Sequence, residues 1–186
     1  MNIIFISSKF QTKNWRFNNI CNKKGQKNNK AEIYQRKNIE IITNQICKKT
    51  NGLRINWRKN IIKVNKTPFK SNDCFDWTED FDGIQYFNNA EIVLLYNFKF
   101  VCDKGGAQNR TLRDTCKFIE SQLKFINNNI DTKYVFINIL DGDECYNNKN
   151  KFNYILNLDE YKNAKKKCLV LDSYEFKNYF ISEFNK

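Results

Sequence analysis

The sequence predicts an α/β domain in which helices flank a mixed central β-sheet. A nearly uninterrupted apolar run at 91–102 has the composition of a buried central strand. An amphipathic helical pattern follows at 111–126, and a second buried strand follows at 134–140. This alternation of strands and helices is typical of α/β domains. The chain of 186 residues, 15% of them aromatic, is long enough and apolar enough to bury a core.

The first third of the chain carries the weakest patterns. Residues 1–30 show no firm periodicity, and 22–30 has the composition of a mobile basic loop. Isoleucines at helical spacing predict a helix over 31–49. Residues 54–64 are rich in β-branched and aromatic side chains and predict a strand. Turn-forming residues then place a boundary near 66–72.

Beyond that boundary the patterns are clearer. A strand at 83–87 is joined to the apolar strand at 91–102 by Asn88–Asn89, a turn dipeptide. The strand at 134–140 is stopped at 141–143, for which a turn is favoured over a second acidic site. The remaining patterns predict helices at 152–158, 160–167 and 174–184 and a strand at 168–172.

The charge of the chain is divided unevenly between its two parts. Residues 1–72 hold 17 Lys and Arg against two acids, whereas residues 73–186 hold 15 against 18. The whole net charge of +12 therefore comes from the first part. We interpret 1–72 as a basic region that either contacts nucleic acid or forms part of the core, and 73–186 as the α/β core.

Basic and aromatic residues are interleaved in the N-terminal region. Trp57 lies among the candidate DNA-binding residues Arg54, Arg58 and Lys59. Lys and Arg neutralise phosphates, and Trp and Arg can stack on bases. The alternative is a solvated surface with no binding role.

Several classes of site are excluded by composition. The chain has no His, which removes Ser-His-Asp and Cys-His catalysis and histidine metal sites. Its seven Cys form no CxxC pair, so we expect reduced thiols in a reducing, cytoplasmic compartment. No apolar run is long enough to span a membrane, and no membrane partner is expected.

An acidic cluster precedes the strand at 83–87. Asp76, Glu79, Asp80 and Asp82 lie within seven residues, and such a cluster is stable when it is solvated or binds a cation. Mg²⁺ prefers oxygen ligands of this kind. The alternative is a turn, since Asp82 precedes Gly83.

Two polar residues interrupt the apolar strand at 91–102. Asn97 and Lys99 are two residues apart and therefore share one face of that strand. A Lys in this position needs a charged partner or a path to solvent. Beside a carboxylate–metal site, it could orient or deprotonate a water or stabilise negative charge.

A glycine-rich turn leads into the helix at 111–126. Gly105–Gly106 permits close approach of a ligand, and the helix N-terminus favours anions. Thr111 and Asp114 have the spacing of a capping box, which is a structural role. Both interpretations remain open at this point.

These residues, in this order, resemble the PD-(D/E)XK restriction-endonuclease-like nucleases, in particular type II restriction endonucleases. The similarity spans about residues 73–176. It is carried by WTEDFDG (77–83), YNFKFVCDKGGAQNRTLRD (96–114), YVFINILDGD (134–143) and KFNYIL (151–156). The resemblance implies a restriction-endonuclease-like core and Mg²⁺-dependent hydrolysis of DNA phosphodiester bonds.

The resemblance also implies roles for individual residues. Asp82 would be the first metal-binding acid, with Asp80 as the competing choice, and Lys99 would be the motif lysine. The family carries Asp or Glu where this chain has Asn97. Some members place that acid in the following helix, where Asp114 would supply it.

The family mechanism then predicts a DNA-cleaving site and its partners. Lys99 would assist attack at phosphorus, and Gln108, Arg110 and Arg113 would contact double-stranded DNA. Cutting both strands needs two sites, which is consistent with a homodimer. The alternatives are a catalytically impaired DNA-binding protein on the same scaffold and a basic RNA-binding protein.

Overall fold

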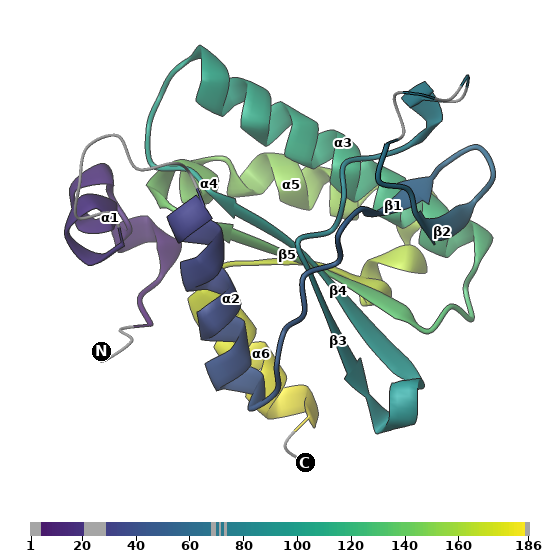
Figure 1. Cartoon of the computed structure of the whole chain (residues 1–186). Coiled ribbons are helices and arrows are strands. Elements are labelled where there is room, and N and C mark those ends of the chain that lie inside the picture. Colours follow the sequence, from purple (N-terminus) through teal and green to yellow (C-terminus); the bar gives the residue numbers. More distant parts are fainter. Residues whose placement is uncertain (1–4, 21–28, 68–69, 71, 73, 185–186) are drawn as a thin grey trace.

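A four-stranded mixed sheet forms the centre of the computed structural model, which describes residues 5–20, 29–67, 70, 72 and 74–184 (Figure 1). The strand order is β3–β4–β5–β6, with β3 antiparallel to β4 and the other pairs parallel. The strands are β3 (Gly83–Phe87), β4 (Ile92–Phe100), β5 (Tyr134–Asp141) and β6 (Cys168–Leu171).

Helices cover both faces of this sheet. On β4, Val93 and Leu95 point to the core beneath α3 (Gly106–Asn128). The alternate residues Leu94 and Tyr96 point to a second core beneath α2 and α6. The remaining helices are α1 (Lys13–Asn19), α2 (Asn29–Thr43), α4 (Asp143–Asn147), α5 (Lys149–Leu156) and α6 (Ser173–Phe184). Short 3-10 turns are η1 (Ser8–Phe10), η3 (Cys74–Asp76), η4 (Asn88–Ala90), η5 (Asp159–Tyr161) and η6 (Ala164–Lys167).

A separate two-stranded hairpin lies beside the main sheet. It consists of β1 (Leu53–Asn56) and β2 (Ile61–Val64), paired antiparallel. The segment 76–81 runs along β1, as backbone bonds show: Trp57 N to Asp76 O (3.0 Å), Thr78 N to Ile55 O (3.0 Å) and Phe81 N to Leu53 O (2.9 Å). The same segment continues into β3 and so joins the hairpin to the sheet.

The predicted α/β class with a mixed sheet flanked by helices is confirmed. The strand predicted over 54–64 is instead the β1–β2 hairpin, because the chain turns at 57–60, where Asn60 has φ 50°. The helix predicted over 31–49 ends at Thr43, since Asn44 adopts φ 52°. The helix predicted from residue 111 begins five residues earlier, at Gly106.

The basic N-terminal region contributes to the same folded body as the sheet. Helix α2 contacts both β4 and α6, and Figure 1 shows α2 and α6 side by side on one face. Of the basic loop predicted over 22–30, residues 22–28 lie outside the described part of the chain, and Asn29 and Lys30 begin α2.

Two further sequence expectations concern the environment of the protein. Within the described residues, every helix is too short or too polar to cross a bilayer. The six described cysteines are free thiols.

Candidate functional site

Asp82 and Lys99 border one polar cleft between the α2 and α3 sides of the molecule. Antiparallel pairing of Gly83 with Tyr96 places the start of β3 opposite the middle of β4, so Asp82, which precedes β3, lies beside the second half of β4, where Lys99 is. The cleft has a volume of about 380 Å³. Its other lining residues include Arg16, Glu32, Gln35, Phe100, Asp103, Gln108 and Thr111.

The Asp82 carboxylate is held in place by the neighbouring strand. Its Oδ2 accepts a hydrogen bond of 2.7 Å from the backbone N–H of Phe98. Burial raises the pKa of Asp82 to about 6, although Lys99 and the Phe98 N–H lower it in part. Glu32 and Glu79 add to the upward shift. Asp82 is therefore an electrostatically strained acid that a bound cation would stabilise.

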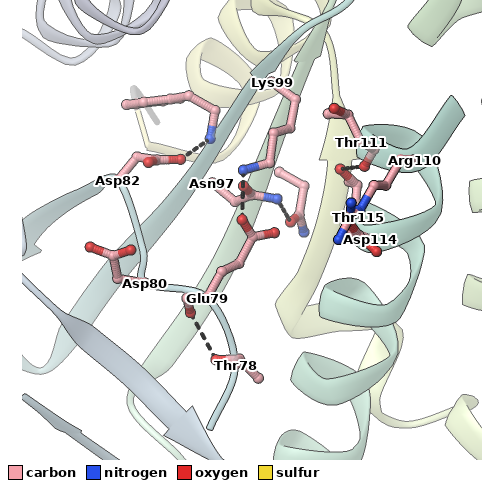
Figure 2. Close-up of polar contacts among 12 residues, drawn as sticks. Thr78, Glu79, Asp80, Asp82, Asn97, Lys99, Arg110, Thr111, Asp114 and Thr115 are labelled. Carbon is pink, nitrogen blue, oxygen red and sulfur yellow. Dashed lines mark hydrogen bonds and ion pairs between the residues drawn. The ribbon is translucent and has the colours of Figure 1, made fainter. Parts of the chain in front are cut away.

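Lys99 donates a hydrogen bond to Glu79 (Figure 2). Its Nζ lies 3.0 Å from Glu79 Oε2, and 18% of the side chain is exposed. Burial lowers the pKa of Lys99, but Glu79 and then Asp82 raise it by more, so the net pKa is above the ordinary value. Lys99 is therefore a cation at neutral pH. It is suited to stabilising negative charge and not to accepting a proton from water.

Arg36 on α2 anchors the backbone at Asp82. Its Nη2 donates to the carbonyl oxygen of Asp82 and to Glu32 Oε1, both at 2.6 Å. Gly83 allows this approach, because a Cβ there would lie 2.5 Å from Cys47 Sγ and 3.4 Å from Arg36 Nη1. Sequence reasoning missed Arg36 and Glu32, which lie 46 and 50 residues before Asp82 and belong to no local motif.

Asn97 occupies the β4 position where the resembling family carries an acid. Its Nδ2 donates to Asn138 Oδ1 on β5 at 3.0 Å, and the residue is fully buried. Its Oδ1 is buried without a hydrogen-bond partner in the described residues. Figure 2 shows the side chain next to those of Lys99 and Glu79. The amide oxygen of Asn97 therefore occupies the position at which the family resemblance implies a carboxylate.

The other predicted metal-binding acids lie outside the cleft lining. Asp114 is on α3 with 51% of its side chain exposed, and its Oδ2 lies 3.8 Å from Arg110 Nε. Asp82 and Asp114 are on opposite sides of Lys99 in Figure 2. Asp80 pairs with Arg54 at 3.5 Å. The predicted convergence is thus found for Asp82 and Lys99, whereas Asp114 is not among the residues that line the cleft. Glu79 does not line the cleft either, but unlike Asp114 it contacts Lys99 and acts electrostatically on Asp82.

The predicted DNA-binding residues fall into three places. Gln108 lines the cleft, and the exposed Arg110 is on the same helix. Arg113 borders a different groove, next to Lys151. Arg54 is a structural residue, because its Nη1 donates to Thr78 O at 2.8 Å and its side chain is only 15% exposed. Arg58 and Lys59 are exposed at the tip of the β1–β2 hairpin.

The oxygen donors at the cleft fit a hard divalent cation held mainly by water. No group of three or more Asp, Glu, Cys or His within the described ranges is arranged to hold a metal. Asp82 and Glu79 interact electrostatically, and Asn97 Oδ1 is an unpartnered oxygen beside them. Mg²⁺ typically takes one or two carboxylates and keeps several waters, so this donor set fits it.

Comparisons with known proteins give no family assignment. No family model matches the chain, and neither the curated proteins nor the solved structures contain a significant match to it.

Proposed function

We propose that this chain is a Mg²⁺-dependent endodeoxyribonuclease of the PD-(D/E)XK, restriction-endonuclease-like type. The observation that carries the proposal is the pairing of Asp82 and Lys99 at one cleft, on adjacent antiparallel strands, with the pKa of Asp82 raised to about 6. A strained carboxylate beside a buried ammonium is a common feature of active sites. The basic N-terminal region, with 17 Lys and Arg against two acids, favours a polyanionic substrate.

Each residue at the cleft has a distinct role in the proposed reaction. Asp82 and Glu79 would hold the cation, which when bound lowers the pKa of a water and polarises the phosphodiester. Lys99 stabilises the negative charge that develops at phosphorus. Arg36 positions Asp82 by fixing its carbonyl oxygen. A second copy of the chain would supply the site for the other DNA strand.

The direct test is cleavage of supercoiled plasmid by the purified protein. We expect nicked and then linear products with Mg²⁺ or Mn²⁺, and none with EDTA. Binding without cleavage in either metal would instead support the catalytically impaired DNA-binding protein. Preferential binding of RNA, with intact plasmid, would support the basic RNA-binding protein.

The identity of the second acid can be tested by comparing Glu79→Gln with Asp114→Asn. Glu79 contacts Lys99 and acts on Asp82, whereas Asp114 is exposed and paired with Arg110. We expect Glu79→Gln to lower the single-turnover cleavage rate by about tenfold or more, and Asp114→Asn to change it by less than about threefold. The reverse order of effects would place the second acid on α3, as the family resemblance implies.

Cleavage should rise with pH through about 6 at subsaturating Mg²⁺. Burial raises the pKa of Asp82 to about 6, and only the ionised carboxylate can bind a cation. Single-turnover rates between pH 5 and 8.5 should therefore increase and then level off above about pH 7. More Mg²⁺ should move the midpoint to lower pH, because metal and proton compete for Asp82. A rate that is independent of both pH and Mg²⁺ in this range would contradict the assignment.

A further inference from the structure

A strongly exposed phenylalanine lies beside the β1–β2 hairpin, outside the catalytic cleft. Phe75 is 91% exposed, and Trp57 at the hairpin turn is 47% exposed. Ile61 and Val64 on β2 are 40% and 51% exposed. Ile61 and Val64 lie on opposite faces of β2, so the exposed rings of Phe75 and Trp57 are the groups available to a partner here.

Contacts among the neighbouring residues hold the Trp57 ring and the Phe75 backbone in place. Trp57 Nε1 donates to the carbonyl oxygen of Phe75 at 3.3 Å. The guanidinium of Arg58 lies 5.3 Å from the centre of the Trp57 ring, and its Nε is 3.0 Å from Asp76 Oδ1. A concave surface of about 450 Å³ is lined by Phe75, Asp76, Arg58, Lys59 and Asn72.

The charge around these rings selects the kind of partner. The chain has no acid between residues 41 and 72, and the hairpin carries Arg58, Lys59 and Lys63. The centres of protein–protein interfaces are depleted in Lys, whereas aromatic rings among Lys and Arg are typical of nucleic-acid-binding surfaces. Arg58 is paired with Asp76 at 3.0 Å, and Lys63 on β2 is exposed.

We propose that the β1–β2 hairpin and Phe75 form a second nucleic-acid contact, in which Phe75 stacks on a base and the surrounding cations bind phosphates. The base belongs either to a single strand or to an opened step of a duplex, and both present the same aromatic face. This contact requires no metal and no cleavage, so it stands separately from the nuclease proposal.

The chain connects this contact directly to the catalytic cleft. Phe75 comes seven residues before Asp82, and the intervening segment 76–81 is bonded along β1. Seven extended residues span at most about 23 Å, which is about seven base steps of 3.4 Å. One nucleic acid of less than a helical turn can therefore reach both places.

The test is binding of a fluorescently labelled 24-mer, as a duplex and as a single strand, in EDTA. We expect Phe75→Ala to weaken binding of at least one form by about tenfold, and Phe75→Trp to retain it. The preferred form identifies the source of the base. Tyr154→Ala is the matched control, since Tyr154 on α5 is 70% exposed and lies outside the hairpin. Lys63→Gln should reduce the slope of log affinity against log salt by about one.

The outcomes distinguish this contact from the proposed enzyme. If Phe75→Ala binds both forms as tightly as Tyr154→Ala, or if wild-type protein binds neither form, the contact is refuted. Cleavage in Mg²⁺ at saturating protein is measured separately. A defect of Phe75→Ala in EDTA supports the contact even if no variant cuts DNA.

Discussion

Asp82→Asn is expected to lower Mg²⁺-dependent DNA cleavage by two orders of magnitude or more. The amide oxygen can still accept the hydrogen bond from the Phe98 N–H, but the negative charge that holds the cation is lost. Single-turnover cleavage of a plasmid at saturating protein measures the chemical step apart from binding. Asp131→Asn is the matched control, because Asp131 is exposed and distant from the lining of the cleft.

The same substitution should stabilise the fold at alkaline pH. The folded-state pKa of Asp82, about 6, is above the ordinary aspartate value of 3.8, so the folded protein binds this proton more tightly than the unfolded chain. Stability from this group is therefore lost as the pH rises from about 4 to about 6. Asparagine resembles the protonated acid, so Asp82→Asn should raise the free energy of unfolding by about 1–3 kcal/mol at pH 8.

The activity measurement has its own contradicting outcome. Equal cleavage rates of Asp82→Asn and wild type would refute the catalytic role of Asp82.

Gly142→Ala is expected to destabilise the protein by about 3 kcal/mol or more. Gly142 follows β5 with φ +97°, a conformation that side chains with a Cβ rarely adopt. A Cβ there would overlap the carbonyl oxygen of Val101 and lie 2.6 Å from its carbonyl carbon. Both atoms are backbone and are fixed, since Val101 N donates to Asp141 O at 2.9 Å. The melting temperature should fall by roughly 6–12 °C.

Gly106→Ala is the control for that experiment. Gly106 begins α3, and a Cβ built on it meets no atom within 4 Å. Alanine at this position should leave stability unchanged or raise it by up to about 1 kcal/mol. Thermal and urea unfolding of both variants give the comparison. Equal stability of the two variants would mean that the turn after β5 differs from the one described.

The sheet could be predicted from the sequence because its signals are local. The apolar run of β4 and the stripe of α3 each determine an element without reference to the rest of the chain. The sequence predicted one strand over 54–64 where the structure has two. Apolar residues lie on both sides of the turn, and a turn of only four residues is too short to interrupt the apolar pattern visibly. The early start of α3 was missed because Gly105–Gly106 has low helix propensity.

The candidate site was only partly predictable, for a different reason. Asp82 and Lys99 stand out because each breaks a local pattern, and the pairing of β3 with β4 brings them together. Arg36 and Gln35 come from α2, and only the packing of that helix against β4 brings Gln35 to the cleft and Arg36 to the Asp82 carbonyl. The family resemblance implied Asp114 as the second metal-binding acid, but the rotation of α3 on the sheet leaves that side chain exposed.

The packing of α2 between β4 and α6 has a consequence for synthesis on the ribosome. The helix that fixes the Asp82 carbonyl is made early and packs against β4, yet its contact with α6 forms only when residues 173–184 have emerged and folded. A nascent chain thus contains β3 and β4 before α2 and α6 can pack together on the face of the sheet. The arrangement of Arg36 and Asp82 would then be completed only at the end of folding, whatever reaction the site performs.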